Sequence, residues 1–301
     1  MYLTGFADEA AKDIDGQIRA TRELGWKYIE ARNIDGINLT DISDEKFDEV
    51  RGKLEDAGVQ VNCFGSAIAN WGKDVADPNE TSLEETRRAI PRMKALGSGL
   101  IRIMSYGIRR DDEGNPLDQM KDKRFEKLRE IVRMFTDEGL QPVHENCMNF
   151  GGMGWKYTQE LLENVPGLKL VFDTANPVNT PDYASGEPGQ MQSAWDFYSH
   201  VKDHVAYVHI KDARYVGPQP GNIFPKSEFT WAGEGDGEVT KIVKDLLDNG
   251  YDGGISMEPH LSVVFHDESV QSEDDVRFNN YVEYGRRFMK LLDEIGHPYR
   301  T

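Results

Sequence analysis

Cysteine, long apolar runs and clustered basic residues are scarce in this sequence, and each shortage argues against a class of protein. The two cysteines, Cys63 and Cys147, lie far apart and form no C-x-x-C pattern, which argues against a disulfide framework and a zinc knuckle. No run of about 18 apolar residues exists, so we expect no membrane span. The first residues have neither the basic region nor the apolar stretch of a signal peptide, so we expect a cytoplasmic protein.

Positive charge is also in short supply. The 301 residues include 35 Lys and Arg against 53 Asp and Glu, which gives a net charge of −18. Such a surface repels nucleic-acid backbones unless a basic groove compensates, and no basic run is longer than a pair such as Arg109-Arg110. We therefore expect no nucleic-acid partner and no membrane partner, whereas a homo-oligomer stays open.

The sequence does contain a repeated junction between a helix and a strand. An amphipathic helical stretch ends in a glycine, and a short apolar run follows it closely. Glycine adopts a left-handed backbone without the steric cost of a Cβ atom, so it often marks a helix end. The junction recurs at Gly25, Gly58, Gly97, Gly139 and Gly250.

This alternation predicts eight strands and eight helices. A strict alternation requires a parallel sheet, and eight units in a chain of 301 residues favour a closed barrel. No G-x-G-x-x-G follows the first strand, so a Rossmann domain lacks support. We therefore expect the α/β class and a single (β/α)8 TIM barrel domain over residues 1–301. The predicted strands cover about 2–6, 26–30, 59–64, 100–104, 140–145, 168–173, 205–210 and 254–258.

One predicted connection is longer than the others. It runs from about residue 213 to 237, after the seventh strand, and is rich in Gly and Pro. A connection of this length on a compact barrel is usually a lid or a binding loop. Its last part, Gly233-Glu234-Gly235-Asp236-Gly237, is either a turn before the next helix or a phosphate-binding loop.

Four successive strands end in residues that commonly bind metals, namely Glu145, Asp173, His209 and Glu258. Active sites of such barrels lie at the C-terminal ends of the strands, so these side chains should emerge at one rim. Three unpaired carboxylates there would repel one another, and a divalent cation with His209 as the fourth ligand removes that cost. We predict one divalent ion at these four residues, with Mn²⁺ favoured and Zn²⁺, Mg²⁺ or Fe²⁺ also compatible.

The same strand ends resemble a known family. The strings are His144-Glu145-Asn146, Phe172-Asp173-Thr174-Ala175-Asn176, His209-Ile210-Lys211-Asp212 and Met257-Glu258-Pro259. They are similar to the xylose isomerase-like TIM-barrel superfamily, in its sugar phosphate isomerase/epimerase branch. The resemblance implies that the matching Glu, Asp, His and Glu bind one catalytic metal. It also implies that Glu145 and Glu258 act as the acid/base pair that moves a proton on and off a carbon beside a carbonyl.

Four residues near these ends are candidates for substrate binding: Lys211, Arg214, His260 and Asn176. Lys211 would polarise a substrate oxygen, orient Asp212 or form an ion pair at the rim. Arg214 would contact a hydroxyl or a phosphate, and His260 would contact the substrate or pack behind it. Asn176 stands where the ketose 3-epimerases of this superfamily have a substrate-contacting His, which argues against epimerisation of free ketohexoses.

Polar residues near the ends of the early strands have two interpretations. Asp8, Glu9, Glu30 and Arg32 form ion pairs of the barrel rim or, as the alternative, help to shape the sugar pocket. Trp71 after the third strand would provide an apolar wall for a sugar ring.

Three functions fit these observations. The leading hypothesis is a metal-dependent isomerase or epimerase of a keto sugar, an inosose or a related sugar, acting by proton transfer through an enediolate. The alternative is a metal-dependent lyase that eliminates from a keto sugar or keto-glycoside after the same proton abstraction. The third is a non-catalytic carbohydrate-binding barrel, against which the complete set of four ligands argues. The zinc-dependent apurinic endonucleases of the superfamily use early histidines, and no His precedes His144 here.

Overall fold

The computed structural model describes residues 1–111, 113–187, 189–219, 225–261 and 273–301. Eight parallel strands form one sheet, hydrogen bonded in the order β1-β12-β9-β8-β7-β6-β5-β2. The edge strands β1 and β2 meet through a parallel bridge between Phe6 and Glu30, so the ring is nearly closed. The predicted (β/α)8 TIM barrel is confirmed. The strands are β1 (Tyr2–Gly5), β2 (Tyr28–Ala31), β5 (Gln60–Gly65), β6 (Leu100–Ile103), β7 (Gln141–Glu145), β8 (Lys169–Asp173), β9 (Val205–Ile210) and β12 (Gly254–Met257).

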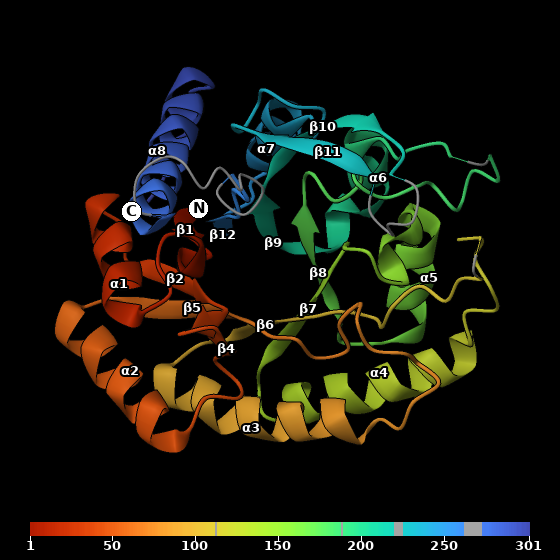
Figure 1. The fold of residues 1–301 in the computed structure, drawn as a ribbon, viewed down its shortest axis with the longest axis horizontal. Coiled ribbons are helices and arrows are strands. Elements are labelled where there is room, and N and C mark those ends of the chain that lie inside the picture. Colours follow the sequence, from red (N-terminus) through yellow and green to blue (C-terminus); the bar gives the residue numbers. More distant parts are fainter. Residues whose placement is uncertain (112, 188, 220–224, 262–272) are drawn as a thin grey trace.

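The helices surround this ring of strands (Figure 1). All five junction glycines have φ angles between 66° and 83°, the left-handed backbone that the sequence predicts at these helix ends. None of the described helices is long and apolar enough to cross a membrane. The helices are α1 (Ile14–Glu23), α2 (Asp44–Ala57), α3 (Glu80–Leu96), α4 (Lys121–Thr136), α5 (Trp155–Asn164), α6 (Ala194–Val201), α7 (Val239–Asp248) and α8 (Glu273–Glu294), with short 3-10 turns η1 (Ala7–Glu9), η2 (Gly151–Met153) and η3 (Lys202–His204).

Two small antiparallel ribbons are added to the barrel. β3 (Asn33–Ile34) pairs with β4 (Ile37–Asn38) just after β2. β10 (Asp212–Gly217) pairs with β11 (Lys226–Thr230) inside the long connection that the sequence predicts after the seventh barrel strand. Residues 220–224 of that connection lie outside the described residues. The connection therefore contains a paired ribbon that continues directly from β9.

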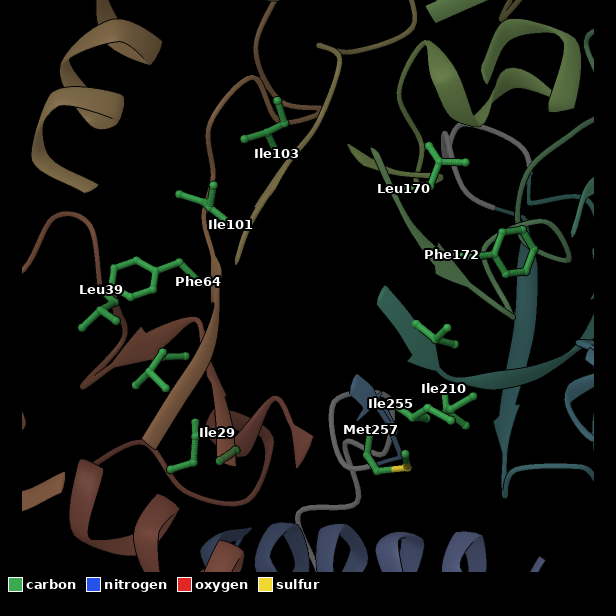
Figure 2. Close-up of a cluster of buried hydrophobic side chains, with 14 of the residues drawn as sticks. Ile29, Leu39, Phe64, Ile101, Ile103, Leu170, Phe172, Ile210, Ile255 and Met257 are labelled. Carbon is green, nitrogen blue, oxygen red and sulfur yellow. The ribbon is translucent and has the colours of Figure 1, made fainter. Parts of the chain in front are cut away.

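Side chains of the barrel strands alternate between two apolar clusters. The larger cluster includes Ile101 and Ile103 of β6 and Phe172 of β8 (Figure 2). Side chains of the helices belong to the same cluster. The smaller cluster consists of Cys63, Val143, Val171 and Tyr207, each of which is fully buried. Because successive residues of a strand point to opposite faces, these four side chains fill the inside of the barrel.

The polar site follows from the same alternation. In three strands, an apolar side chain points into the barrel. The residue two positions later also points inward, and it lies at the C-terminal end of the strand. His144, one residue before Glu145, points the other way and its Nε2 atom lies 2.9 Å from Ser105 Oγ. The period of two thus selects which residue of each motif enters the barrel. Glu145 follows Val143, Asp173 follows Val171, and His209 follows Tyr207 in this way.

Candidate metal centre and active site

The structure brings together the four side chains that the sequence marks as metal ligands. Glu145, Asp173, His209 and Glu258 are buried, and one ligand atom from each lies within 4.8 Å of the others. Glu145 and Asp173 end β7 and β8, His209 lies near the end of β9, and Glu258 follows β12. Neighbouring parallel strands end at the same rim, so residues far apart in sequence meet there.

The imidazole of His209 faces the centre of this group. Its Nε2 atom contacts the carboxylate of Glu30 on β2 at 3.0–3.1 Å. Its Nδ1 atom has no hydrogen-bond partner among the described residues and lies 3.7 Å from Glu145 Oε1 and 3.6 Å from Glu258 Oε2. In the neutral imidazole we assign the proton to Nε2, because Glu30 accepts a hydrogen bond; Nδ1 would then offer its lone pair to a cation between the carboxylates.

Basic side chains hold the outer oxygens of two of these carboxylates. Arg102 of β6 contacts Glu145 Oε2 at 3.0 Å, and Arg32 contacts Glu258 Oε1 at 3.1 Å. The remaining oxygen of Glu145, Oε1, accepts a hydrogen bond from Asn176 Nδ2 at 2.9 Å. The arginines therefore fix the two carboxylates while one oxygen of each stays near the centre.

Lys211 and Asp173 complete the charge distribution. Lys211 Nζ lies 3.1 Å from Asp173 Oδ2 and 3.3 Å from Glu258 Oε2. Asp173 Oδ1 accepts hydrogen bonds from the backbone N–H groups of Ala175 and Asn176 at 2.9 and 2.7 Å. Its other oxygen, Oδ2, is buried and makes no hydrogen bond of good geometry with the described residues, despite the nearby ammonium group. Apart from its ion pair with Lys211, Asp173 Oδ2 thus has no partner among the described residues and could also bind a metal ion.

The pKa values of the group reflect both burial and the opposite charges around each side chain. Burial alone would raise the pKa of Glu145, but Arg102 and His209 hold this pKa at about 2. Burial, together with Glu258 and Glu145, raises the pKa of Asp173 to about 6 against the opposing effect of Lys211. Burial would lower the pKa of His209, yet Glu30 and Glu145 raise it to about 10. The centre thus favours an additional positive charge.

These observations fit a divalent cation. Two buried atoms that have no hydrogen-bond partner among the described residues, Asp173 Oδ2 and His209 Nδ1, belong to the same group as the carboxylates of Glu145 and Glu258. Three carboxylates and one imidazole suit Mn²⁺, Mg²⁺, Fe²⁺ or Zn²⁺ without selecting one of them. Glu30 would then orient the imidazole from behind, an arrangement that often accompanies metal-binding histidines.

A second cluster of metal-type residues is already in contact with a basic side chain of the protein. Glu9, Glu258 and His260 also offer atoms within 4.8 Å of one another. The guanidinium of Arg32 contacts both Glu9 and Glu258, at 3.4 and 3.1 Å, and also contacts Asp8 at 2.9 Å. The early acidic residues and Arg32 thus form an ion-pair network at the rim, and Arg32 also lines the cavity.

A cavity of about 560 Å³ is lined by Glu145 and Glu258 of this group. A volume of this size accommodates a small-molecule ligand. Three of the four predicted substrate-binding residues, Lys211, Asn176 and His260, line this cavity, as does Trp71. His260 has a left-handed backbone with φ of 55°, and its Nδ1 atom lies 2.7 Å from Glu9 Oε1.

Arg214 is not among the described residues that line the cavity. It pairs with Glu228 in the β10–β11 ribbon, whereas the next residue, Tyr215, pairs with the cavity-lining Ser227. Because side chains alternate between the two faces of a ribbon, Arg214 lies on the outer face. It is exposed and donates a hydrogen bond to the carbonyl of Glu234. We therefore leave Arg214 out of the proposed substrate pocket.

Arg102 is one of the cavity residues that the strand-end motifs do not reveal. It is 7% exposed, lines the cavity and contacts Glu145. The signal was a charged residue between Ile101 and Ile103, in the middle of an apolar strand. Such a residue must find a partner inside the protein, because a buried unpaired charge is very costly.

Comparisons with known proteins agree with this geometry. The sequence model of the xylose isomerase-like TIM barrel family matches residues 18–279, so the chain belongs to this family, as its strand-end motifs predict. No curated protein sequence matches it significantly.

Solved structures share the fold along nearly the whole chain. One is a xylose isomerase-like TIM barrel protein from Mycobacterium smegmatis in complex with magnesium, with 17% identity, a TM-score of 0.66 and coverage of 97% of each chain. Another is a D-allulose 3-epimerase from Methylomonas sp. in complex with D-allulose, with 16% identity, a TM-score of 0.61 and coverage of 96% of each chain. A third is the probable 3-DHS dehydratase AsbF from Bacillus anthracis, with 14% identity, a TM-score of 0.67 and coverage of 96% of this chain and 98% of that one.

Proposed function

We propose that this protein is a divalent-metal-dependent isomerase or epimerase of a keto sugar, an inosose or a related sugar. The observation that carries the proposal is the placement of Glu145 and Glu258 in the cavity wall, with one oxygen of each within 3.7 Å of His209 Nδ1. Their strands, β7 and β12, are separated in the sheet by β8 and β9. The two carboxylates therefore reach the mouth of the barrel from different sides.

Two such carboxylates can move a proton between two positions of a substrate. One takes the proton from a carbon beside a carbonyl group, and the other returns a proton to the opposite face of that carbon or to the adjacent carbon. The first outcome is an epimerisation and the second an isomerisation. Arg102 and Arg32 keep the carboxylates in place through their outer oxygens, at 3.0 and 3.1 Å.

The negative charge that proton removal leaves on the substrate must be stabilised. A divalent ion held by Glu145, Asp173, His209 and Glu258 would supply this stabilisation as a Lewis acid. Lys211 lines the cavity next to Glu258, where its ammonium group can donate a hydrogen bond to a substrate oxygen. Asn176 donates to Glu145 Oε1, so we expect it to orient this carboxylate beside the substrate.

A lyase is the second candidate, because elimination begins with the same proton abstraction. The similarity to the probable 3-DHS dehydratase shows that a protein described as a dehydratase has this fold. In a lyase the second carboxylate would protonate a leaving group instead of a carbon.

Incubation of the metal-loaded protein with a panel of keto sugars and inososes in D₂O tests the proposal. We expect deuterium at the carbon beside the carbonyl together with an epimer or isomer of the substrate. A chelator should abolish this exchange, and added metal should restore it. Deuterium with an unsaturated product would identify a lyase, and no exchange with any member of the panel would refute the proposed function.

A further inference from the structure

The basic side chains that line the cavity within the described residues are all engaged by buried carboxylates. Arg32, Arg102 and Lys211 each have such a partner within 3.3 Å. The imidazole of His260 lies 2.7 Å from the carboxylate of Glu9. An anionic substrate group would have to compete with these carboxylates, and an ion pair broken in this way leaves a buried charge without a partner.

Among the described residues, the ribbon beside the cavity turns its basic side chains away from the cavity. Lys226 and Arg214 are exposed on the ribbon, at positions that alternate with the cavity-lining Ser227 and its partner Tyr215. They therefore belong to the outer face of the ribbon. The segments 220–224 and 262–272 lie outside the described residues, and their sequences contain neither lysine nor arginine.

The glycine-rich turn after the ribbon binds a carboxylate of the protein itself. The backbone N–H groups of Gly233 and Gly235 donate to Asp212 Oδ2, and that of Gly237 donates to Asp212 Oδ1, all at 2.9 Å. Asp212 is fully buried. A phosphate-binding turn would hold a phosphate with these same backbone N–H groups, which Asp212 already occupies. The segment is therefore a turn and not a phosphate-binding loop.

The remaining wall of the cavity is neutral and polar. Asn179 Oδ1 and Ser227 Oγ are buried atoms of cavity-lining residues and have no hydrogen-bond partner among the described residues. Buried polar atoms normally have partners, so these two atoms fit hydroxyl groups of a ligand. Trp71 and Phe229 add apolar surface for the C–H groups of a sugar. Further asparagines in the wall are Asn33, Asn38, Asn70 and Asn176.

We infer that the substrate is an uncharged keto sugar or cyclic polyol ketone that carries neither a phosphate nor a carboxylate group. The reaction in this inference is taken from the proposed function. The substrate class is inferred from the ion-paired basic side chains and the neutral wall of the cavity.

Matched substrate pairs test the inference. Each pair consists of a keto sugar and its terminal phosphate ester, incubated with the metal-loaded protein in D₂O, and binding of both is measured by calorimetry. We expect kcat/KM to be at least about 100-fold higher for the uncharged member, because the ester must break a buried ion pair. An ester that reacts as well as the free sugar, or better, overturns the inference.

Calorimetry separates a failure of the inference from a failure of the proposed function. If neither member of any pair exchanges deuterium, the proposed function is refuted. In that case, binding of the uncharged members alone still supports the inference. Binding of the esters alone, or no binding of any uncharged member, overturns it.

Two variants add a direct test of the neutral wall. Ser227→Ala removes a hydroxyl without a partner among the described residues, so the fold should persist while KM for the uncharged substrate rises about threefold to tenfold. Ser185→Ala, at an exposed position that does not line the cavity, is the matched control and should leave KM unchanged. Asn179→Lys adds a cation to the wall and should narrow the preference for the free sugar over its ester. Two results together would overturn the assignment of this wall to the substrate. They are an unchanged KM in Ser227→Ala and an unchanged preference for the free sugar over its ester in Asn179→Lys.

Discussion

The two halves of the barrel contribute to the site in different ways. The second half supplies the four metal-type side chains, at the ends of β7, β8 and β9 and just after β12. The first half supplies groups that hold them. Arg102 of β6 contacts Glu145, Arg32 contacts Glu258, and Glu30 of β2 contacts His209. The metal-type side chains and several of the groups that contact them thus come from parts of the chain that meet only in the closed barrel.

This division predicts different consequences for variants of the two halves. A change to a carboxylate of the second half should remove a reacting group, whereas a change in the first half should leave its partner charged, buried and unpaired. We therefore expect loss of turnover in the former case, and loss of stability or metal affinity in the latter.

The largest effect is expected at the two carboxylates of the cavity. Glu145→Gln and Glu258→Gln keep the size of the side chain and one oxygen ligand but cannot accept a proton at useful pH. Turnover at saturating metal should fall by about 10²–10⁴-fold, the usual contribution of general acid–base catalysis. Steady-state rates and deuterium exchange should be measured together with the metal content of each variant. Wild-type exchange in both fully metallated variants would contradict the two-carboxylate mechanism, because another group would then have to remove the proton.

The next largest effect concerns the stability of the metal-free protein. Arg102→Met removes one partner of a buried ion pair whose side chains are 8% and 2% exposed. The free energy of unfolding should fall by about 3–5 kcal/mol, because Glu145 stays buried without its counterion. Arg286→Ala breaks an exposed pair with Glu23 and is the matched control, with an expected loss of about 0–1 kcal/mol. Urea titrations of both variants measure the difference, and equal losses would show that the first half does not stabilise the site.

A smaller effect, on metal affinity, is expected from Glu30, which contacts the imidazole of His209. Glu30→Gln should weaken metal binding by about 10–100-fold, because the neutral amide polarises and orients the imidazole less strongly. Competition with a fluorescent chelator measures this affinity independently of activity. Asp173→Asn, which replaces a proposed ligand, should weaken binding further. Unchanged affinity in Glu30→Gln would mean that His209 needs no support from the first half.

The smallest effect is expected on the ribbon. Arg214→Ala should change kcat and KM by no more than about twofold, as is usual for a surface substitution. Its side chain is exposed on the outer face of β10, where it contacts the Glu234 carbonyl. A tenfold rise in KM, measured with the substrate found in the panel, would instead place the outer face of the ribbon at the site.

The sequence by itself determined the barrel and the identity of the four clustered side chains. Both follow from local rules. Glycine ends the helices with a left-handed residue, and the period of two in a strand decides that Glu145 rather than His144 faces inward. Because parallel strands of a barrel end at a common rim, a polar residue at a strand end can be placed without knowing its neighbours.

Only the tertiary structure decided which charges meet. Arg32 lies 226 residues from Glu258, and Glu30 lies 179 residues from His209. The sequence analysis treated Glu30 and Arg32 mainly as rim ion pairs and gave Arg102 no role. The reason is physical: an ion pair depends on distances of about 3 Å between side-chain atoms, and strand periodicity gives only the face on which a residue lies. The register of β10 against β11, which turns Arg214 outward, is likewise set by a pairing between two strands and not by either strand alone.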